Sequence, residues 1–143
     1  MAIARSLTAR AARAIMGDSR SSEGDASVHE LKGMATRIRF YLGESDHFRG
    51  RPLHHEIVLE AKSAGLAGVT VFRGIEGYGA SSRIKSVGVL DLSSDLPVVV
   101  EIVDGEDRIQ AILPRLLEMV DGGLVTRESV AVLKYTHPPE QRG

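Results

Sequence analysis

One apolar run in the second half of the chain, interrupted by a single glutamate, constrains the fold more than any other feature. Residues 98–103 read Val-Val-Val-Glu-Ile-Val, and Pro97 precedes them. A short continuous run rich in β-branched residues is typical of a strand that is covered on both faces. The run therefore predicts a buried strand, and the rest of the chain has to supply its neighbours and its covering layers.

Three further segments alternate between apolar and polar residues with a period of two, which marks a strand with one covered face. These segments are residues 36–43, 68–75 and 129–135. Residues 87–92 are another predicted strand, which forms with 97–103 either a hairpin or one bent strand.

Two segments have the apolar spacing of amphipathic helices. The first begins near Pro52, where the missing N–H of proline costs nothing, and ends at Gly65. The second ends at Gly122 and Gly123. Pro114 lies inside the second helix, so we expect this helix to be kinked or divided there.

The order β-α-β-β-β-α-β predicts an α+β protein with the ferredoxin-like βαββαβ plan. Both helices connect strands of one sheet and should lie on the same face of it. The opposite face carries Val99, Val103 and similar residues. A large apolar face is rarely left open in a monomer, so we expect self-association to cover it.

Composition excludes several classes of protein. The chain has 143 residues, 18 Lys and Arg against 19 Asp and Glu, and no cysteine. Disulfide scaffolds, cysteine zinc sites and thiol catalysis are therefore excluded. The balanced charge argues against a nucleic-acid binder. No apolar run is long enough to span a bilayer as a helix.

The chain divides near Met34. Residues 1–34 read as a short basic segment followed by a polar linker, so we expect a disordered or short helical tail. A transit peptide is one interpretation, and a true start at Met34 is the other. The predicted domain is 35–135, and residues 136–143 are a second tail.

The loop over residues 76–86 is the first candidate site. Glycines permit close approach of backbone N–H groups to an anion, and basic residues near them suit phosphate. The loop is also longer than a hairpin needs, and long loops tend to carry function. A plain flexible loop is the alternative. The residues concerned are Arg73, Gly74, Gly77, Gly79, Arg83 and Lys85.

Two other features are weaker. Gly122 and Gly123 are explained by helix termination alone. His47, His54 and Glu56 are candidates for a metal site, but histidines at the surface are the more ordinary interpretation. No nucleophile and base stand together, so we expect no catalytic residues.

Several motifs occur in an order that resembles a known family. They are Leu42-Gly43-Glu44, Arg51-Pro52-Leu53, Ala64-Gly65-Leu66-Ala67-Gly68-Val69-Thr70-Val71, Arg73-Gly74-Ile75, Gly77-Tyr78-Gly79, Leu96-Pro97-Val98-Val99-Val100 and Gly123-Leu124-Val125-Thr126. Together they resemble domain of unknown function one-ninety, a family of small PII-like proteins. The resemblance covers about Arg37 to Tyr135.

The resemblance implies a PII-like homotrimer that binds an adenine nucleotide (AMP, ADP or ATP) in clefts between subunits. PII proteins use a loop after their second strand and a turn after their second helix for this. Arg73 and Lys134 are additional candidate cations of this site, chosen by their position in the chain and not because they match a family motif. The implied ligand-binding residues are Arg73, Gly77, Tyr78, Gly79, Arg83, Lys85, Gly122, Gly123, Leu124, Val125, Thr126 and Lys134.

The chain departs from true PII proteins in two places. Its loop is much shorter, and the turn after the second helix reads Gly-Gly-Leu-Val-Thr, without the lysine of the PII turn. Tyr78 is not taken as the modified tyrosine of some PII proteins. Relatives in the family are associated with fluoride-exporting membrane channels, which implies a regulatory partner.

We therefore expect a cytoplasmic, trimeric signalling protein in which an adenine nucleotide orders the 76–86 loop and modulates a partner protein. Two alternatives stay open: a trimer that binds a divalent metal, and an adaptor of a membrane channel that binds no small ligand. An enzyme is the class with least support.

Overall fold

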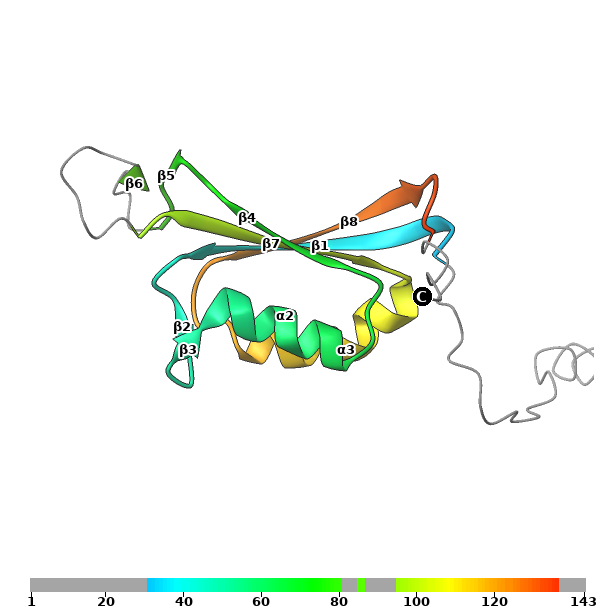
Figure 1. The fold of residues 1–143 in the computed structure, drawn as a ribbon, viewed down its shortest axis with the longest axis horizontal. Coiled ribbons are helices and arrows are strands. Elements are labelled where there is room, and N and C mark those ends of the chain that lie inside the picture. The colour runs from blue at the N-terminus through cyan, green and yellow to red at the C-terminus, as the bar shows by residue number, and fades with distance from the viewer. Residues whose placement is uncertain (1–30, 81–84, 87–94, 137–143) are drawn as a thin grey trace, which may run out of the picture.

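The computed structural model describes residues 31–80, 85–86 and 95–136 (Figure 1). The main elements are β1 (Gly33–Gly43), α2 (Leu53–Ser63), β4 (Val69–Arg73), β7 (Pro97–Asp104), α3 (Glu106–Glu118) and β8 (Leu124–Val132). Two short ladders accompany them, formed by β2 (His47–Phe48) with β3 (Arg51–Pro52), and by β5 (Glu76–Gly77) with β6 (Lys85–Ser86).

The main sheet has the order β4-β7-β1-β8, and every neighbouring pair is antiparallel. Figure 1 shows both helices under one face of this sheet. This is the ferredoxin-like arrangement that the order of the elements predicts. The apolar run 98–103 lies in β7, between β4 and β1 in the interior of the sheet.

The boundaries of the first and last strands along the chain differ from those predicted from the sequence. The strand β1 begins at Gly33, because Gly33 and Met34 pair with Val132 and Ala131 of β8. The last strand begins at Leu124 rather than Ser129, since its first residues pair with the end of β1. The predicted strand 87–92 lies outside the described residues.

Pro114 does not divide the second helix. The helix α3 runs continuously from Glu106 to Glu118 with the proline inside it. Ile112 and Leu116, on either side of Pro114, are both buried against the sheet. A proline inside a helix costs about 3 kcal/mol, and burial of two large aliphatic side chains offsets a cost of that size.

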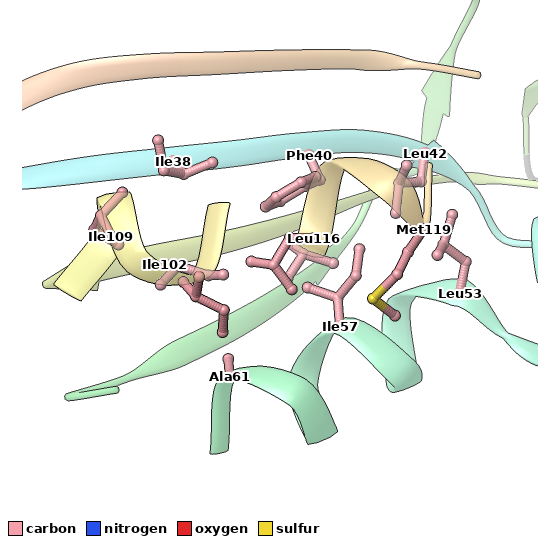
Figure 2. Close-up of a cluster of buried hydrophobic side chains, with 12 residues drawn as sticks. Ile38, Phe40, Leu42, Leu53, Ile57, Ala61, Ile102, Ile109, Leu116 and Met119 are labelled. Atoms are coloured by element: carbon pink, nitrogen blue, oxygen red, sulfur yellow. The ribbon is translucent and has the colours of Figure 1, made fainter. Parts of the chain in front are cut away.

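The core lies between the sheet and the two helices (Figure 2). Phe40 of β1 is fully buried at its centre and points toward α3. The strands β1 and β7 contribute every second residue, which is the alternation expected of a strand that packs on one face. The buried members of the core are Ile38, Phe40, Leu42, Leu53, Ile57, Ala61, Val100, Ile102, Ile109, Ile112, Leu116 and Met119.

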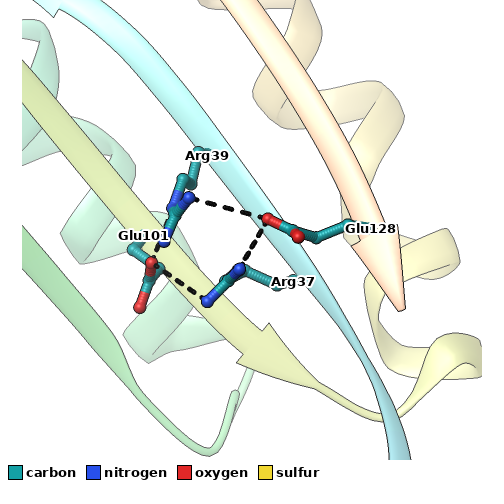
Figure 3. Close-up of polar contacts among 4 residues, drawn as sticks. All are labelled: Arg37, Arg39, Glu101 and Glu128. Carbon is teal, nitrogen blue, oxygen red and sulfur yellow. Dashed lines mark hydrogen bonds and ion pairs between the residues drawn. The ribbon is translucent and has the colours of Figure 1, made fainter. Parts of the chain in front are cut away.

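The opposite face of the sheet carries an ion-pair cluster, which we call the sheet-face quartet (Figure 3). Arg39 Nε lies 2.7 Å from Glu101, and Arg37 Nη2 lies 2.7 Å from Glu128. The hydrogen bond to Glu101 raises the pKa of Arg39 above its ordinary value. Charged residues thus occupy the middle of a face that the helices leave open.

Exposed apolar side chains lie beside the sheet-face quartet. Tyr41, Phe72 and Leu124 are 37%, 51% and 57% exposed. The strand register puts all three on the open face, with the outward residues of β7. The run 98–103 is therefore fully buried only on its helix side, and Val99, Glu101 and Val103 are half-buried.

A buried carboxylate connects the end of β7 to neighbouring segments. Asp104, at the end of β7, is fully buried. Its Oδ2 accepts a hydrogen bond of 2.8 Å from the N–H of Ala67, and its Oδ1 accepts one from the N–H of Gly105. Tyr135 donates its hydroxyl to the carbonyl of Ala67. These bonds tie the turn before β4 to the start of α3 and to the segment after β8.

Glu106 predicts a pH dependence of stability. Hydrogen bonds from Thr36 and then from Arg127 lower the pKa of Glu106 below its ordinary value of 4.5. A depressed pKa in the folded state stabilises the fold above the unfolded pKa, and this stabilisation is lost as the pH falls through the folded pKa. We expect Glu106→Gln to reduce the loss of melting temperature between about pH 6 and about pH 3. An unchanged acid-induced loss in thermal unfolding of this variant would contradict the assignment.

Candidate functional site

A cavity of about 660 Å³ lies at one end of the sheet. The end of β1, the start of β7, the first residue of α2 and the turn after α3 all contribute to its wall. The segment after β4 completes it. A volume of this size is typical of sites that bind a small organic ligand. The lining residues are Tyr41, Leu42, Gly43, Asp46, His47, Leu53, Gly74, Glu76, Gly77, Tyr78, Gly79, Ala80, Lys85, Pro97, Val99, Met119, Asp121, Gly122 and Gly123.

Close backbone packing holds the segment after β4 against the start of β7. The N–H of Gly74 donates to the carbonyl of Pro97 over 2.7 Å. A Cβ atom at Gly74 would lie only 2.7 Å from Pro97 Cγ, and one at Gly77 would lie 3.1 Å from it. These two glycines therefore let the chain pass beside the proline ring. Gly79, by contrast, has open space around it.

The two glycines after α3 have different roles. Gly123 has a φ of +130° and approaches β1 so closely that a Cβ would lie 2.6 Å from the Tyr41 carbonyl oxygen. Only glycine fits such a position without strain. Gly122 has no atom within 4 Å of where its Cβ would be. The structure thus requires Gly123 for the fold and leaves Gly122 free to face the cavity.

Lys85 is held beside the cavity by Asp95. The Lys85 ammonium donates to Asp95 Oδ2, and the N–H of Ser45 donates to Asp95 Oδ1 over 2.7 Å. Burial by itself raises the pKa of Asp95, but the hydrogen bonds from Lys85 and Ser45 outweigh it, so the pKa lies below its usual value. Asp95 is therefore ionised at neutral pH, as an ion pair with Lys85 requires.

The cavity brings together half of the residues expected to bind ligand. Gly77, Tyr78, Gly79 and Lys85 come from one predicted segment, and Gly122 and Gly123 come from the other. The sequence offered these as two separate weak signals. The tertiary structure places them around one cavity, at the same end of the sheet.

Other expected residues do not line the cavity. Arg73 pairs with Glu44 over 2.8 Å. Lys134 follows the end of β8, which pairs with the start of β1 and so lies at the opposite end of the sheet. The expected turn at Leu124, Val125 and Thr126 is wrong, because these are the first three residues of β8. Arg83 lies outside the described residues.

Sequence reasoning missed most of the wall supplied by β1 and the residues after it. Gly43 lines the cavity, and its N–H donates to Asp46 Oδ2 over 2.7 Å. Asp121 lines it from the turn after α3. A usable signal was present, because Asp46 and His47 follow a predicted strand in a polar loop. Of these two residues the sequence predicts only His47, and only as a metal ligand.

The histidine-rich alternative finds no support among residues 31–80, 85–86 and 95–136, where no three His, Asp or Glu side chains are placed to hold one metal ion. His47 lines the cavity, and its Nδ1 lies within hydrogen-bond distance of the Ser45 carbonyl.

In the part of the chain that the structure describes, no helix is both long and apolar enough to cross a membrane.

Residues 35–132 match the family model DUF190, described as Uncharacterized ACR, COG1993. The chain belongs to this family. A UPF0166 protein of Aquifex aeolicus (strain VF5) is 41% identical over 99 residues, which cover 67% of this chain and 90% of that protein. The resemblance inferred from the motifs is thereby confirmed.

Two solved structures with PII-like descriptions align with this DUF190 chain. A putative PII-like signalling protein of Thermus thermophilus aligns with a TM-score of 0.50 and 20% identity, over 70% of this chain and 90% of that one. This likeness supports the fold alone. CPII of Thiomonas intermedia K12, a nitrogen regulatory PII-like protein bound to ADP, AMP and bicarbonate, aligns with a TM-score of 0.48 and 16% identity, over 71% and 90%. That likeness is too low to transfer its ligands.

Proposed function

We propose that this protein is a homotrimeric PII-like regulator that binds an adenine nucleotide in the cavity and modulates a partner protein. One observation carries the proposal: the two glycine segments expected to contact the nucleotide meet in one cavity of about 660 Å³. The PII-like fold of the chain agrees with this use, because PII-like proteins are regulators rather than catalysts. The family resemblance supplies the adenine nucleotide as the ligand class.

The wall of the cavity suits the parts of a nucleotide. Tyr41, Val99 and Pro97 provide an apolar surface for a purine ring. Lys85 and the turn at Gly122 provide a cation and small residues where the phosphates would bind. Carboxylates also line the cavity, so a nucleotide that carries Mg²⁺ matches its charge better than a free nucleotide. These carboxylates belong to Asp46, Glu76 and Asp121.

The open face of the sheet supports self-association. Tyr41 belongs both to this face and to the cavity wall, and it is 37% exposed in the single chain. A partner subunit on the open face would cover Phe72 and Leu124 and would extend the wall of the cavity. Assembly of three chains would therefore place each cavity at a boundary between subunits.

A thermal-shift screen of the full chain tests the nucleotide assignment. We expect AMP, ADP or ATP to raise the melting temperature in a concentration-dependent manner, more strongly with Mg²⁺, because a ligand of the folded state stabilises it by mass action. Adenosine and guanine nucleotides are the comparison ligands. No shift with any adenine nucleotide, with or without Mg²⁺, would contradict the proposed function.

Substitution of Gly122 locates the site. We expect Gly122→Val to weaken nucleotide binding by about tenfold or more, since a branched side chain would enter the cavity where the phosphates bind. The melting temperature of the unliganded protein should change little, because a Cβ at Gly122 meets no atom within 4 Å. The measurement is calorimetric titration with ADP.

Gly68→Val is the matched control for that substitution. Gly68 also has open space around its Cβ position, but it precedes β4 at the end of the sheet away from the cavity. We expect wild-type nucleotide affinity in this variant. Equal affinities of the Gly122 and Gly68 variants would show that the nucleotide binds elsewhere.

A further inference from the structure

Lys85 is the lysine that lines the cavity, and its ammonium already forms an ion pair with Asp95. Among the described residues that line the cavity, it is the single lysine or arginine. Its ammonium pairs with Asp95, whose other oxygen is fixed by the Ser45 N–H at 2.7 Å. Asp95 itself is not part of the cavity wall. Asp95 therefore contacts Lys85 from outside the set of residues that line the cavity.

The other charged residues that line the cavity are acidic, so the pairing of Lys85 with Asp95 affects how an anionic ligand binds. Asp46, Glu76 and Asp121 add negative charge around the cavity. An entering anion would be repelled by these groups and would find one ammonium, which Asp95 neutralises. An anionic ligand consequently has to compete with Asp95 for Lys85, whereas a neutral ligand does not.

The pair is placed so that this competition can succeed. The side chains of Lys85 and Asp95 are 33% and 27% exposed. Ion pairs that water reaches stabilise a fold only weakly, so their separation costs little. A phosphate group carries more charge than a carboxylate and offers more acceptor oxygens, which favours it as the partner of an ammonium.

We propose that Lys85 exchanges Asp95 for a phosphate group of the ligand, so that Asp95 sets how strongly the cavity prefers phosphorylated ligands. This inference rests on the proposed nucleotide site and names the pair of residues that determines its specificity. The low pKa of Asp95 agrees with it, because the carboxylate stays charged throughout the neutral range and always competes. Adenosine, which brings no charge, leaves the pair in place.

The test is calorimetric titration of the full chain with ADP, adenosine and inorganic pyrophosphate. We expect Asp95→Asn to strengthen ADP binding by about three- to tenfold, because the amide no longer competes for Lys85 yet still accepts from the Ser45 N–H. Lys85→Met should weaken ADP binding by about tenfold. Adenosine affinity should stay within about twofold in both variants.

A double substitution separates exchange from simple repulsion. If Asp95 acts through Lys85, Asp95→Asn has no effect on ADP affinity in the Lys85→Met background. If Asp95 merely repels the ligand, the gain persists there. Glu76→Gln is the control, since it removes an equal charge from the wall without touching the pair. A gain that persists in the double variant, or that Glu76→Gln equals, overturns the exchange.

The outcomes also separate this inference from the proposed function. Nucleotide binding with no change, or a loss, in Asp95→Asn overturns the exchange and keeps the nucleotide site. Pyrophosphate binding with the expected dependence on Lys85 and Asp95, but without binding of any nucleotide, keeps the exchange and overturns the nucleotide assignment. Absence of binding by both probes overturns both.

Discussion

Replacement of Gly123 by alanine is expected to lower the free energy of unfolding by about 2–4 kcal/mol, which for a domain of this size corresponds to a fall in melting temperature of about 10–20 °C. Two causes act together. The φ of +130° is a conformation that residues with a side chain rarely adopt, and the new methyl group would lie 2.6 Å from the Tyr41 carbonyl oxygen. The backbone of two neighbouring strands would have to separate where β8 begins.

Gly122→Ala is the matched control for this prediction. It adds the same methyl group one residue earlier, where nothing lies within 4 Å and the φ is ordinary. We expect its melting temperature to stay within a few degrees of wild type at equal protein concentration. Similar melting temperatures for the two alanine variants would show that the close approach of Gly123 to Tyr41 is not a constraint.

The second large effect is expected at Asp104. Asp104→Ala should lower the free energy of unfolding by about 2–4 kcal/mol, because it removes the buried carboxylate that accepts from the N–H groups of Ala67 and Gly105. The loss would weaken the connection between the turn before β4 and the start of α3, where the bond from Arg108 to the Gly65 carbonyl would remain. Chemical denaturation monitored by circular dichroism measures this change.

Two further variants frame the Asp104 experiment. Asp104→Asn keeps one accepting oxygen, so we expect a loss of intermediate size. Asp107→Ala removes an exposed carboxylate from the first turn of α3 and should cost less than about 1 kcal/mol. A loss for Asp104→Ala no larger than that for Asp107→Ala would contradict the structural role of the buried carboxylate.

Local pattern was sufficient for most of the fold. The alternation in 36–43, the apolar run 98–103 and the helix end at Gly65 each report on neighbours along the chain. The second helix ends at Glu118, four residues before the predicted end at Gly122. Such signals survive because a half-buried strand or helix imposes its period on the sequence wherever it packs. The order of these elements then predicted the ferredoxin-like arrangement, which the structure confirms.

Elements set by distant partners were not visible in the same way. Leu124 to Thr126 follow a glycine pair and look like a turn, yet they form the start of β8, because they pair with Tyr41 to Arg39. Pro114 predicted a kink or a division of the helix, and α3 is not divided there, since burial on both sides of the proline holds it together. In both cases contacts with residues far along the chain decided against the local preference.

The candidate site shows the same division. The sequence by itself determined which residue types are present: glycines, which have no side chain, and a few cations. Only the tertiary structure decided that Gly77 and Gly122 face one cavity, that Lys134 lies at the other end of the sheet, and that Lys85 pairs with Asp95. The physical reason is that side-chain chemistry belongs to single residues, whereas a binding site depends on distances between segments, and those distances exist only after the core has packed.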